Sequence, residues 1–306
     1  MTRSDAAHLV ELRGVAKAYG ARVALRDVSF TLEPGAIALV GHNGAGKTTL
    51  MKLMLGLVRP TAGTVRVLGD NPTAGEFAGR RRLGYLPESI AFSGALTGRE
   101  TLAFYARLKG CPDKRCAPLL ERVGLADAAN LRVGTYSKGM RQRLGLAQAL
   151  IGEPDILLLD EPTTGLDPAL RRTFYEIVRE CAARGAVALL SSHALDELED
   201  QVGRVIILDR GLKKAEGSLD ALRGLARLPT RVRARVNGAL PALPEDLGPP
   251  RACGPGLFEL KIPEARKIET LRALLDGQGG LLDVEVIPPS LDELYAHFLS
   301  QREAAP

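Results

Sequence analysis

The stretch Gly41-His42-Asn43-Gly44-Ala45-Gly46-Lys47-Thr48-Thr49 carries the strongest signal in this chain. It follows the apolar run 37–40, and apolar residues at helical spacing come after it. Strand, glycine-rich loop and helix form the context in which the pattern G-x-x-x-x-G-K-[ST] binds phosphate. Gly41 and Gly46 let the backbone turn tightly and approach an anion without a Cβ in the way. Amide groups of the loop and of the helix start then face the phosphates.

Two side chains of this phosphate loop (residues 41–49) are placed for nucleotide chemistry. Lys47 can reach the terminal phosphates, and the Thr48 hydroxyl is placed to bind Mg²⁺. The alternative is a chance match in a chain with 33 glycines. The correct strand and helix on either side make that alternative the weaker one, and we expect a nucleotide to bind here.

The composition is that of a globular protein with a sizeable core. The chain has 306 residues, of which 45% are hydrophobic and 25% charged, and this length allows one large domain or two. The net charge of +5 is modest and spread along the chain, so a solvated surface rich in arginine explains it better than an acidic partner. Trp is absent and aromatic residues make up 4%, so we expect no stacking platform for nucleic acid.

Cysteine usage and hydropathy indicate a cytoplasmic protein. The four cysteines lack C-x-x-C spacing, which favours free thiols in a reducing compartment over a metal site at Cys111 and Cys116. The start of the chain lacks the apolar core of a signal peptide. No run approaches the ~18 apolar residues that a membrane span needs. Any role at a membrane therefore requires a separate partner.

The segments before the phosphate loop and well after it differ in pattern. Residues 9–33 form short apolar stretches punctuated by glycines, which predicts antiparallel strands with turns. From 97 to about 152 the pattern becomes helical, beginning with the capping-box spacing of Thr97 and Glu100. We therefore expect a helical insertion between two parts that carry strands.

Two continuous apolar runs, 156–159 and 186–190, predict buried parallel strands, and we expect the sheet to finish with 205–208. Asp160 and Glu161 end the first run, and His193 follows the second. Ligands of α/β sheets bind beyond the carboxyl ends of the strands. Asp160 therefore suits Mg²⁺, and Glu161 suits a water that attacks the γ-phosphate. The alternatives are an exposed acidic turn and a structural histidine.

Ser137 is in the N-cap position of a helix that runs to about residue 150. A capping serine is a common structural feature. A helix N-terminus with a hydroxyl and a glycine, here Gly139, is also an anion site when a phosphate can be brought to it.

Together these motifs resemble those of the ABC-type ATPases. The phosphate loop, Ser137-Lys138-Gly139-Met140, Asp160-Glu161, Gly165-Leu166-Asp167 and His193 occur in one order and at coherent spacings over roughly residues 9 to 220. The resemblance implies a P-loop NTPase of α/β class, with an antiparallel β subdomain and a helical insertion. It also implies an ATPase that uses ATP and Mg²⁺ and works as a homodimer with a membrane permease encoded separately, at the inner face of the cell membrane.

The family pattern implies a role for each residue. Tyr19 stacks on adenine, Asp160 is the Walker B acid, and Glu161 is the catalytic base. Ser137 and Gly139 contact the γ-phosphate of ATP held by the other subunit. The residues expected to bind nucleotide are Tyr19, Gly41, His42, Asn43, Gly44, Ala45, Gly46, Lys47, Thr48, Thr49, Ser137, Gly139 and Asp167. Those expected to bind Mg²⁺ are Thr48, Asp160 and Glu88, and those expected to act in catalysis are Glu161, His193 and Lys47.

Two departures from the family pattern stand out. The usual L-S-G-G-Q signature reads Y-S-K-G-M at 136–140, which keeps the serine and the second glycine. The usual Q-loop glutamine is replaced by Glu88. A glutamate can still ligate Mg²⁺, but it adds negative charge beside the triphosphate.

Several longer blocks are similar to NosF-type subunits, the ATPases of the NosDFY transporters that mature the copper sites of nitrous-oxide reductase. The blocks are the phosphate loop, residues 83–88, residues 99–102 with 106–110, and residues 135–150. This likeness implies a periplasmic copper-site assembly protein as a partner reached through the permease. The alternatives are an ATPase of another exporter (of a drug, a lipid or another small molecule), a non-transport ABC ATPase, and a scaffold that hydrolyses slowly.

The end of the chain predicts a second, small α/β domain. Strands are expected at 230–236, 257–262 and 282–287, with helices at 264–275 and after the capping box of Ser290 and Glu293. We place the nucleotide-binding domain at 1–227, its helical subdomain at about 88–152, and the accessory domain at 228–306. A packing or dimer-stabilising appendage is the preferred interpretation, and a regulatory or docking domain is the alternative.

Overall fold

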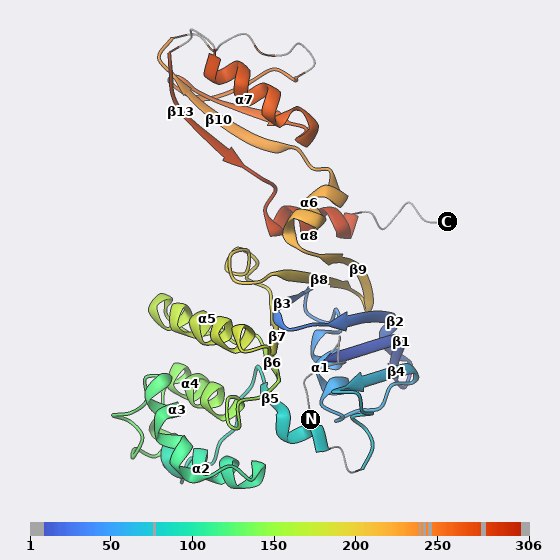
Figure 1. The fold of residues 1–306 in the computed structure, drawn as a ribbon, viewed down its shortest axis with the longest axis vertical. Helices are drawn as coiled ribbons and strands as arrows, with labels where there is room; N and C mark the ends of the chain where they lie inside the picture. Colours follow the sequence, from blue (N-terminus) through green and yellow to red (C-terminus); the bar gives the residue numbers. More distant parts are fainter. Residues whose placement is uncertain are drawn as a thin grey trace. The chain divides into compact units, whose positions relative to one another are not determined.

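The computed structural model describes residues 9–75, 78–238, 240, 243, 247–276 and 280–300 (Figure 1). The chain divides into two compact units, Met1–Glu216 and Gly217–Pro306. The division falls earlier than the expected boundary at 227, because α6 (Leu219–Ala226) packs against α8 (Leu291–Ser300) of the second unit.

The first unit contains two sheets. A three-stranded antiparallel sheet has the order β2-β1-β4, and a six-stranded sheet has the order β5-β6-β7-β3-β8-β9. The strands are β1 (Val10–Tyr19), β2 (Arg22–Leu32), β3 (Gly35–Val40), β4 (Ala62–Val67), β5 (Leu83–Leu86), β6 (Ile156–Asp160), β7 (Val187–Ser192), β8 (Arg204–Asp209) and β9 (Leu212–Gly217). The short stretches expected before the phosphate loop are continuous strands whose register shifts at bulges.

The expectation that β8 finishes the larger sheet is wrong. β9 lies beside β8 as the edge strand. Its residues are partly or fully exposed, so they include charged side chains and lack the apolar run that marks the inner strands. The inner strands pair in parallel, with β3 between β7 and β8.

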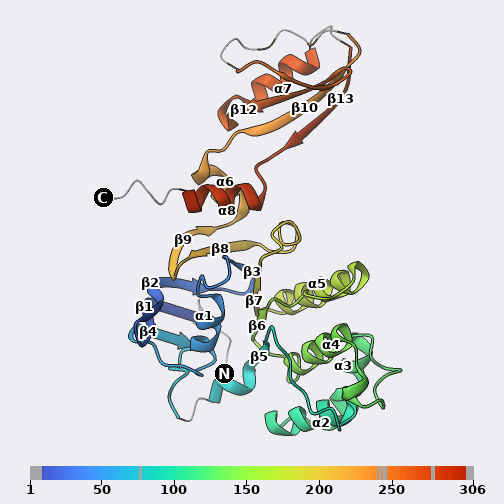
Figure 2. The same ribbon diagram turned by 180° about the vertical axis from the view of Figure 1, so that it is seen from behind.

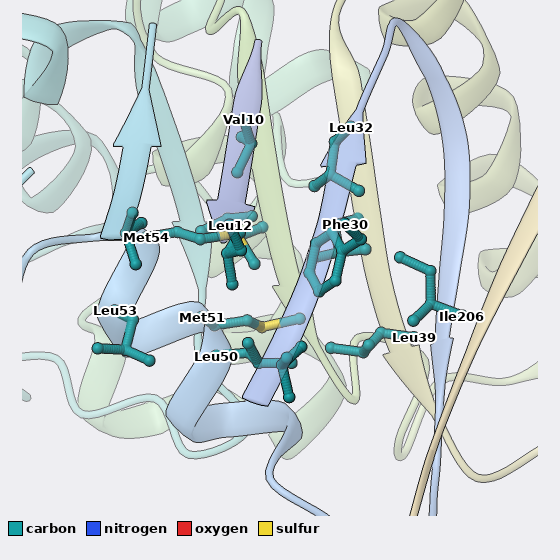
Figure 3. Packing of buried hydrophobic residues seen from close by; sticks show 14 of the residues in the cluster. Val10, Leu12, Phe30, Leu32, Leu39, Leu50, Met51, Leu53, Met54 and Ile206 are labelled. Carbon is teal, nitrogen blue, oxygen red and sulfur yellow. The ribbon is translucent and has the colours of Figure 1, made fainter. Parts of the chain in front are cut away.

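Helix α1 (Lys47–Met54), which follows the phosphate loop, belongs to the main core of the first unit. Leu50, Met51, Leu53 and Met54 are all fully buried. They pack in one cluster with apolar residues of both sheets, such as Leu12, Phe30, Leu32, Leu39 and Ile206 (Figure 3). Helix α1 is apolar on more than one face because both sheets contribute to the core around it.

The helical insertion (residues 88–152) contains α2 (Gly98–Lys109), α3 (Cys116–Arg122) and α4 (Lys138–Ala149), seen in green and yellow-green in Figure 2. The predicted capping box is confirmed, because Thr97 and Glu100 exchange side-chain and backbone hydrogen bonds. Helix α4 is tied to the loop after β6, where Gln142 Nε2 donates to the Pro162 carbonyl at 2.9 Å. The next helix, α5 (Pro168–Ala183), leads to β7.

The second unit is a four-stranded antiparallel sheet with helices. The sheet order is β11-β12-β10-β13. The elements are β10 (Thr230–Val236), β11 (Arg251–Gly254), β12 (Leu257–Ile262), α7 (Lys267–Asp276) and β13 (Leu281–Ile287), together with α6 and α8. The capping box of Ser290 and Glu293 is confirmed at the start of α8. The expected apolar face of α7 is buried only in part: Leu274 is inside, whereas Ile268 and Leu275 are exposed.

Within the described part of the chain, none of the helices has the length and apolar character that crossing a membrane requires. All four cysteines are free thiols.

Candidate functional site

The phosphate loop folds tightly against neighbouring strands. At Gly46, φ is 112°, and an added Cβ would lie 2.9 Å from the carbonyl oxygen of Ala24. At Gly41, a Cβ would lie 2.7 Å from the carbonyl oxygen of Leu208. A side chain at either position would therefore displace the loop, which explains why the sequence has glycine at both.

Lys47 lies inside this loop. Its side chain is buried, its Nζ donates to the Gly41 carbonyl, and Nζ lies 3.6 Å from Oε1 of Glu161. An ammonium group has three donors. Lys47 therefore holds the loop closed and pairs with the carboxylate that follows β6.

Asp160, at the end of β6, is 2% exposed and accepts two hydroxyl hydrogen bonds. Thr48 Oγ1 donates to Oδ2 at 2.8 Å, and Ser191 Oγ donates to Oδ1 at 2.5 Å. Ser191 was not among the predicted site residues. Its only sequence signal is its place as the first polar residue after the apolar run of β7, and the parallel pairing of β6 with β7 sets it opposite Asp160.

Glu161 is held in an uncommon conformation. Its φ is +48°, and its backbone N–H donates to the carbonyl and to Oγ of Ser191, at 3.2 Å and 3.0 Å. Its Oε2 lies 2.8 Å from Nδ1 of His193, whose ring is mostly exposed. Its buried Oε1 has no hydrogen-bond partner among the described residues. One carboxylate oxygen is thus oriented by the histidine, while the other is able to accept a further hydrogen bond.

A cleft of about 470 Å³ opens beside these groups. Its lining consists of Tyr19, Arg22, Ala24, His42, Asn43, Gly44, Gly46, Lys47, Thr48, Thr49, Lys52, Glu88, Asp160 and Glu161. Most predicted site residues are therefore brought together. Gly41 and Ala45 are buried outside the lining. Arg22, Ala24 and Lys52 were missed, because nothing in their local sequence marks them.

Tyr19 and Glu88, which both line the cleft, differ in character. Tyr19 is 45% exposed, and Lys17 Nζ lies over its ring, 4.8 Å from the centroid, so a cation covers one face of the ring. Glu88 is exposed and lines the same cleft as Asp160. Burial, and then the charges of Asp160 and Glu88, raise the pKa of Tyr85 to about 12.

Besides Gly41 and Ala45, four predicted residues do not line the cleft: His193, which contacts Glu161, and Ser137, Gly139 and Asp167. Ser137 caps α4 by accepting a hydrogen bond from Met140 N at 3.2 Å, and Asp167 caps α5 by accepting one from Leu170 N at 2.9 Å. Gly139 lies against Gly165, where an added Cβ would be 3.5 Å from the carbonyl oxygen. Ser137 and Asp167 are exposed, so their polar groups are accessible to another molecule.

The donor set suits Mg²⁺ once phosphate is present. The Thr48 hydroxyl and the Asp160 carboxylate are hydrogen-bonded oxygens at the cleft, and Glu88 supplies another carboxylate. Mg²⁺ is commonly bound by one or two carboxylates together with substrate phosphates and water. No cluster of three or more His, Cys, Asp or Glu side chains able to hold a metal occurs in the described ranges. The residues therefore fit a metal that arrives with a nucleotide.

Comparisons with known proteins agree with this geometry. Residues 25–164 match the family described as "ABC transporter". The chain is 39% identical over 218 residues to Nod factor export ATP-binding protein I of Burkholderia orbicola, which covers 70% of this chain and 72% of that protein. It is 40% identical over 220 residues to the uncharacterized ABC transporter ATP-binding protein YxlF of Bacillus subtilis, with the same coverage.

Solved structures of ABC transporter proteins have a fold similar to that of this chain. An ATP-binding subunit of an ABC transporter superposes with a TM-score of 0.67 at 34% identity, over 71% of this chain and 92% of that chain. A bacterial Atm1-family ABC exporter with ATP bound superposes with a TM-score of 0.64 at 25% identity, over 70% of this chain and 39% of that chain.

Proposed function

The chain belongs to the family of ABC transporter ATP-binding proteins, which hydrolyse ATP, and we propose that it is the subunit that powers a separate membrane permease. The observation that carries the proposal is one network at the cleft. Thr48 and Ser191 hold Asp160, while Lys47 and His193 flank Glu161. These are the groups that ATP hydrolysis needs, in contact with one another.

In this mechanism the phosphate loop and Lys47 bind the phosphates of ATP. Mg²⁺, held by Thr48, Asp160 and Glu88, supplies neutralising charge when it is bound. Oε1 of Glu161 accepts a hydrogen bond from a water, while His193 keeps the carboxylate oriented through Oε2. The water oxygen bonds to the γ-phosphorus as the bond to the bridging oxygen breaks, the water gives a proton to the Glu161 carboxylate, and ADP and phosphate leave.

A second copy of the chain completes the site in this proposal. Ser137 and Gly139 lie at the start of α4, outside the cleft. The hydroxyl and the helix N-terminus can reach a γ-phosphate only if it is held by another molecule. Asp167, at the start of α5, lies on the adjoining turn. ATP then joins the two copies, and hydrolysis separates them.

The helical insertion carries this motion to the permease. Phe104 and Leu108 on α2 are 51% and 65% exposed, which leaves apolar surface for a partner. In this proposal the subunit lies in the cytoplasm, at the inner face of the membrane. The second unit serves as a packing or dimer-stabilising appendage.

For the cargo, we favour the NosF-type role in assembling the copper sites of nitrous-oxide reductase, with a periplasmic assembly protein reached through the permease. Support comes from the longer sequence blocks described above. The second candidate is the ATPase of another exporter, and one of the relatives is named Nod factor export ATP-binding protein I.

Two experiments test the proposal. Purified wild type, with the permease that co-purifies with it, should hydrolyse MgATP, and a turnover no higher than that of Glu161→Gln would refute the ATPase role. Deletion of the gene should leave nitrous-oxide reductase short of copper. Full copper content, or an unrelated permease in the purified complex, would refute the NosF-type role and leave the second candidate.

A further inference from the structure

The imidazole ring of His42, in the phosphate loop, has an oxygen acceptor at each nitrogen. Nε2 lies 2.9 Å from Oδ1 of Asp209, the last residue of β8. Nδ1 lies 2.7 Å from the carbonyl oxygen of Asn43. Neither oxygen carries a proton when the carboxylate is ionised, so neither can donate to the ring.

These two contacts determine the protonation state of the ring. A neutral imidazole has one N–H donor and one bare nitrogen. A bare nitrogen would direct its lone pair at an oxygen lone pair across 2.7 or 2.9 Å, which is repulsive. Both nitrogens therefore carry a proton. We propose that His42 is an imidazolium that fixes the phosphate loop for nucleotide binding. The charge of the ring is inferred from its two contacts alone, whereas its effect on nucleotide binding rests on the proposed function.

The surrounding charges support a cation at this position. Asp209 is 3% exposed, and a buried carboxylate requires a charged or hydrogen-bonding partner. The other charged groups that line the cleft are Arg22 from β2, Lys47 and Lys52 from α1, Glu88 from the loop after β5, and Asp160 and Glu161 from the end of β6. Three cations and three anions balance among these lining groups, and the carboxylate in direct contact with the ring is that of Asp209.

The proton on Nδ1 has a structural consequence for the loop. It holds the carbonyl of Asn43, and the N–H of the same planar peptide, which belongs to Gly44, points in the opposite direction. The turn after β8 supports the loop at a second point, because Gly211 N–H donates to the Ala45 carbonyl at 2.9 Å. His42 is thus a positioning residue: it aims a loop amide away from its own ring and neutralises Asp209 near the phosphates.

Nitrogen NMR of the intact protein tests the protonation state directly. The chain has only four histidines, so the His42 signals can be identified as those lost in His42→Gln. At about pH 7.5, where an ordinary imidazole is mostly neutral, both ring nitrogens of His42 should show protonated shifts. In Asp209→Asn the counter-charge is gone, and one nitrogen should become bare. A bare nitrogen on His42 in the wild type would overturn the proposal.

Binding measurements test the consequence for the nucleotide. His42→Gln keeps a single amide group to serve two acceptors, and we expect its Kd for MgATP to rise about tenfold, with kcat at saturating ATP nearly unchanged. His297→Gln in α8 is the matched control and should change neither value. An unchanged Kd in His42→Gln would refute the positioning role. Wild type that binds ATP without hydrolysing it would refute the proposed function, while the NMR result would stand.

Discussion

Polar side chains around the phosphate loop are buried and paired with charged or polar side chains, whereas those compared with them in the helical insertion are not. Around the loop, Lys47, Asp160 and Glu161 are all buried, and each contacts a polar or charged partner within the same chain. In the insertion, the hydroxyl of Ser137 is exposed. Lys109 is half-buried, and its Nζ donates only to the carbonyls of Leu83 and Ile151, at 2.7 and 2.9 Å. Among the residues that the structure describes, no carboxylate pairs with it.

This difference in burial indicates that the two regions have different roles in nucleotide binding and in assembly. A buried charge network keeps its geometry without ligand, so the loop side can bind nucleotide in a single chain. The exposed start of α4 has no such network, and in the proposed dimer it would contact phosphate only across the interface between the two copies. Substitutions on the loop side should therefore affect chemistry within one chain, and substitutions at the exposed start of α4 should affect assembly.

The largest effect is expected from Glu161→Gln on the loop side. Glutamine keeps the size of the side chain and can still bond to His193, but it cannot accept a proton from water. Turnover should fall by about a hundredfold or more, with MgATP binding retained. Phosphate release and nucleotide titration measure the two quantities. Glu153→Gln, a carboxylate outside the cleft lining, should behave as wild type. Loss of binding together with turnover would mean that Glu161 acts mainly by holding Lys47.

Ser137→Ala tests the insertion side, and Ser218→Ala is its matched control. Both serines cap a helix by accepting a hydrogen bond from a backbone N–H at 3.2 Å. Each substitution should cost about 1 kcal/mol of stability. Only Ser137→Ala should also lower turnover, roughly ten- to a hundredfold, because in the proposed dimer only Ser137 contacts the ATP held by the partner. Equal turnover in the two variants would place Ser137 outside the catalytic assembly.

Glu88→Gln alters a cleft-lining residue at the point where the helical insertion begins. It removes one negative charge from the cleft that receives the triphosphate, so MgATP should bind about fivefold more tightly. Calorimetric titration in the presence of Mg²⁺ measures the change. Glu121→Gln on α3 removes an equal charge away from the cleft and should have no effect. Weaker binding in Glu88→Gln would show that the carboxylate contributes more as a metal ligand than it costs in repulsion.

The local sequence was sufficient to predict the phosphate loop, but it did not predict contacts between residues that are far apart in the chain. Residues 41–49 form their loop and helix from adjacent residues, so their pattern is sufficient. Ser191 meets Asp160 only because β6 and β7 pair in one register, and Asp209 meets His42 only because β8 lies beside β3. Edge strand β9 and helix α6 were missed because most of their residues are partly or fully exposed and show no continuous apolar run.

The smallest effect should come from Lys109→Met, which we expect to alter stability alone. Burial lowers the pKa of Lys109 from its usual 10.5 to about 8, because no carboxylate offsets the loss of hydration. Between these two values the unfolded chain binds more protons than the folded one, so this lysine makes stability rise with pH. Below about pH 8 the side chain is charged in both states, and its burial penalty is fully present.

Urea unfolding between about pH 7.5 and pH 10 would measure this slope. Wild type should gain stability relative to Lys109→Met as the pH rises, by up to about 1 kcal/mol per pH unit. Lys114→Met, an exposed lysine of the same insertion, should keep the wild-type slope. Parallel curves for wild type and Lys109→Met would mean that Lys109 remains charged in the folded protein. The insertion would then resemble the loop side in having a buried lysine that stays charged. The contrast between the two regions would rest on Ser137 alone.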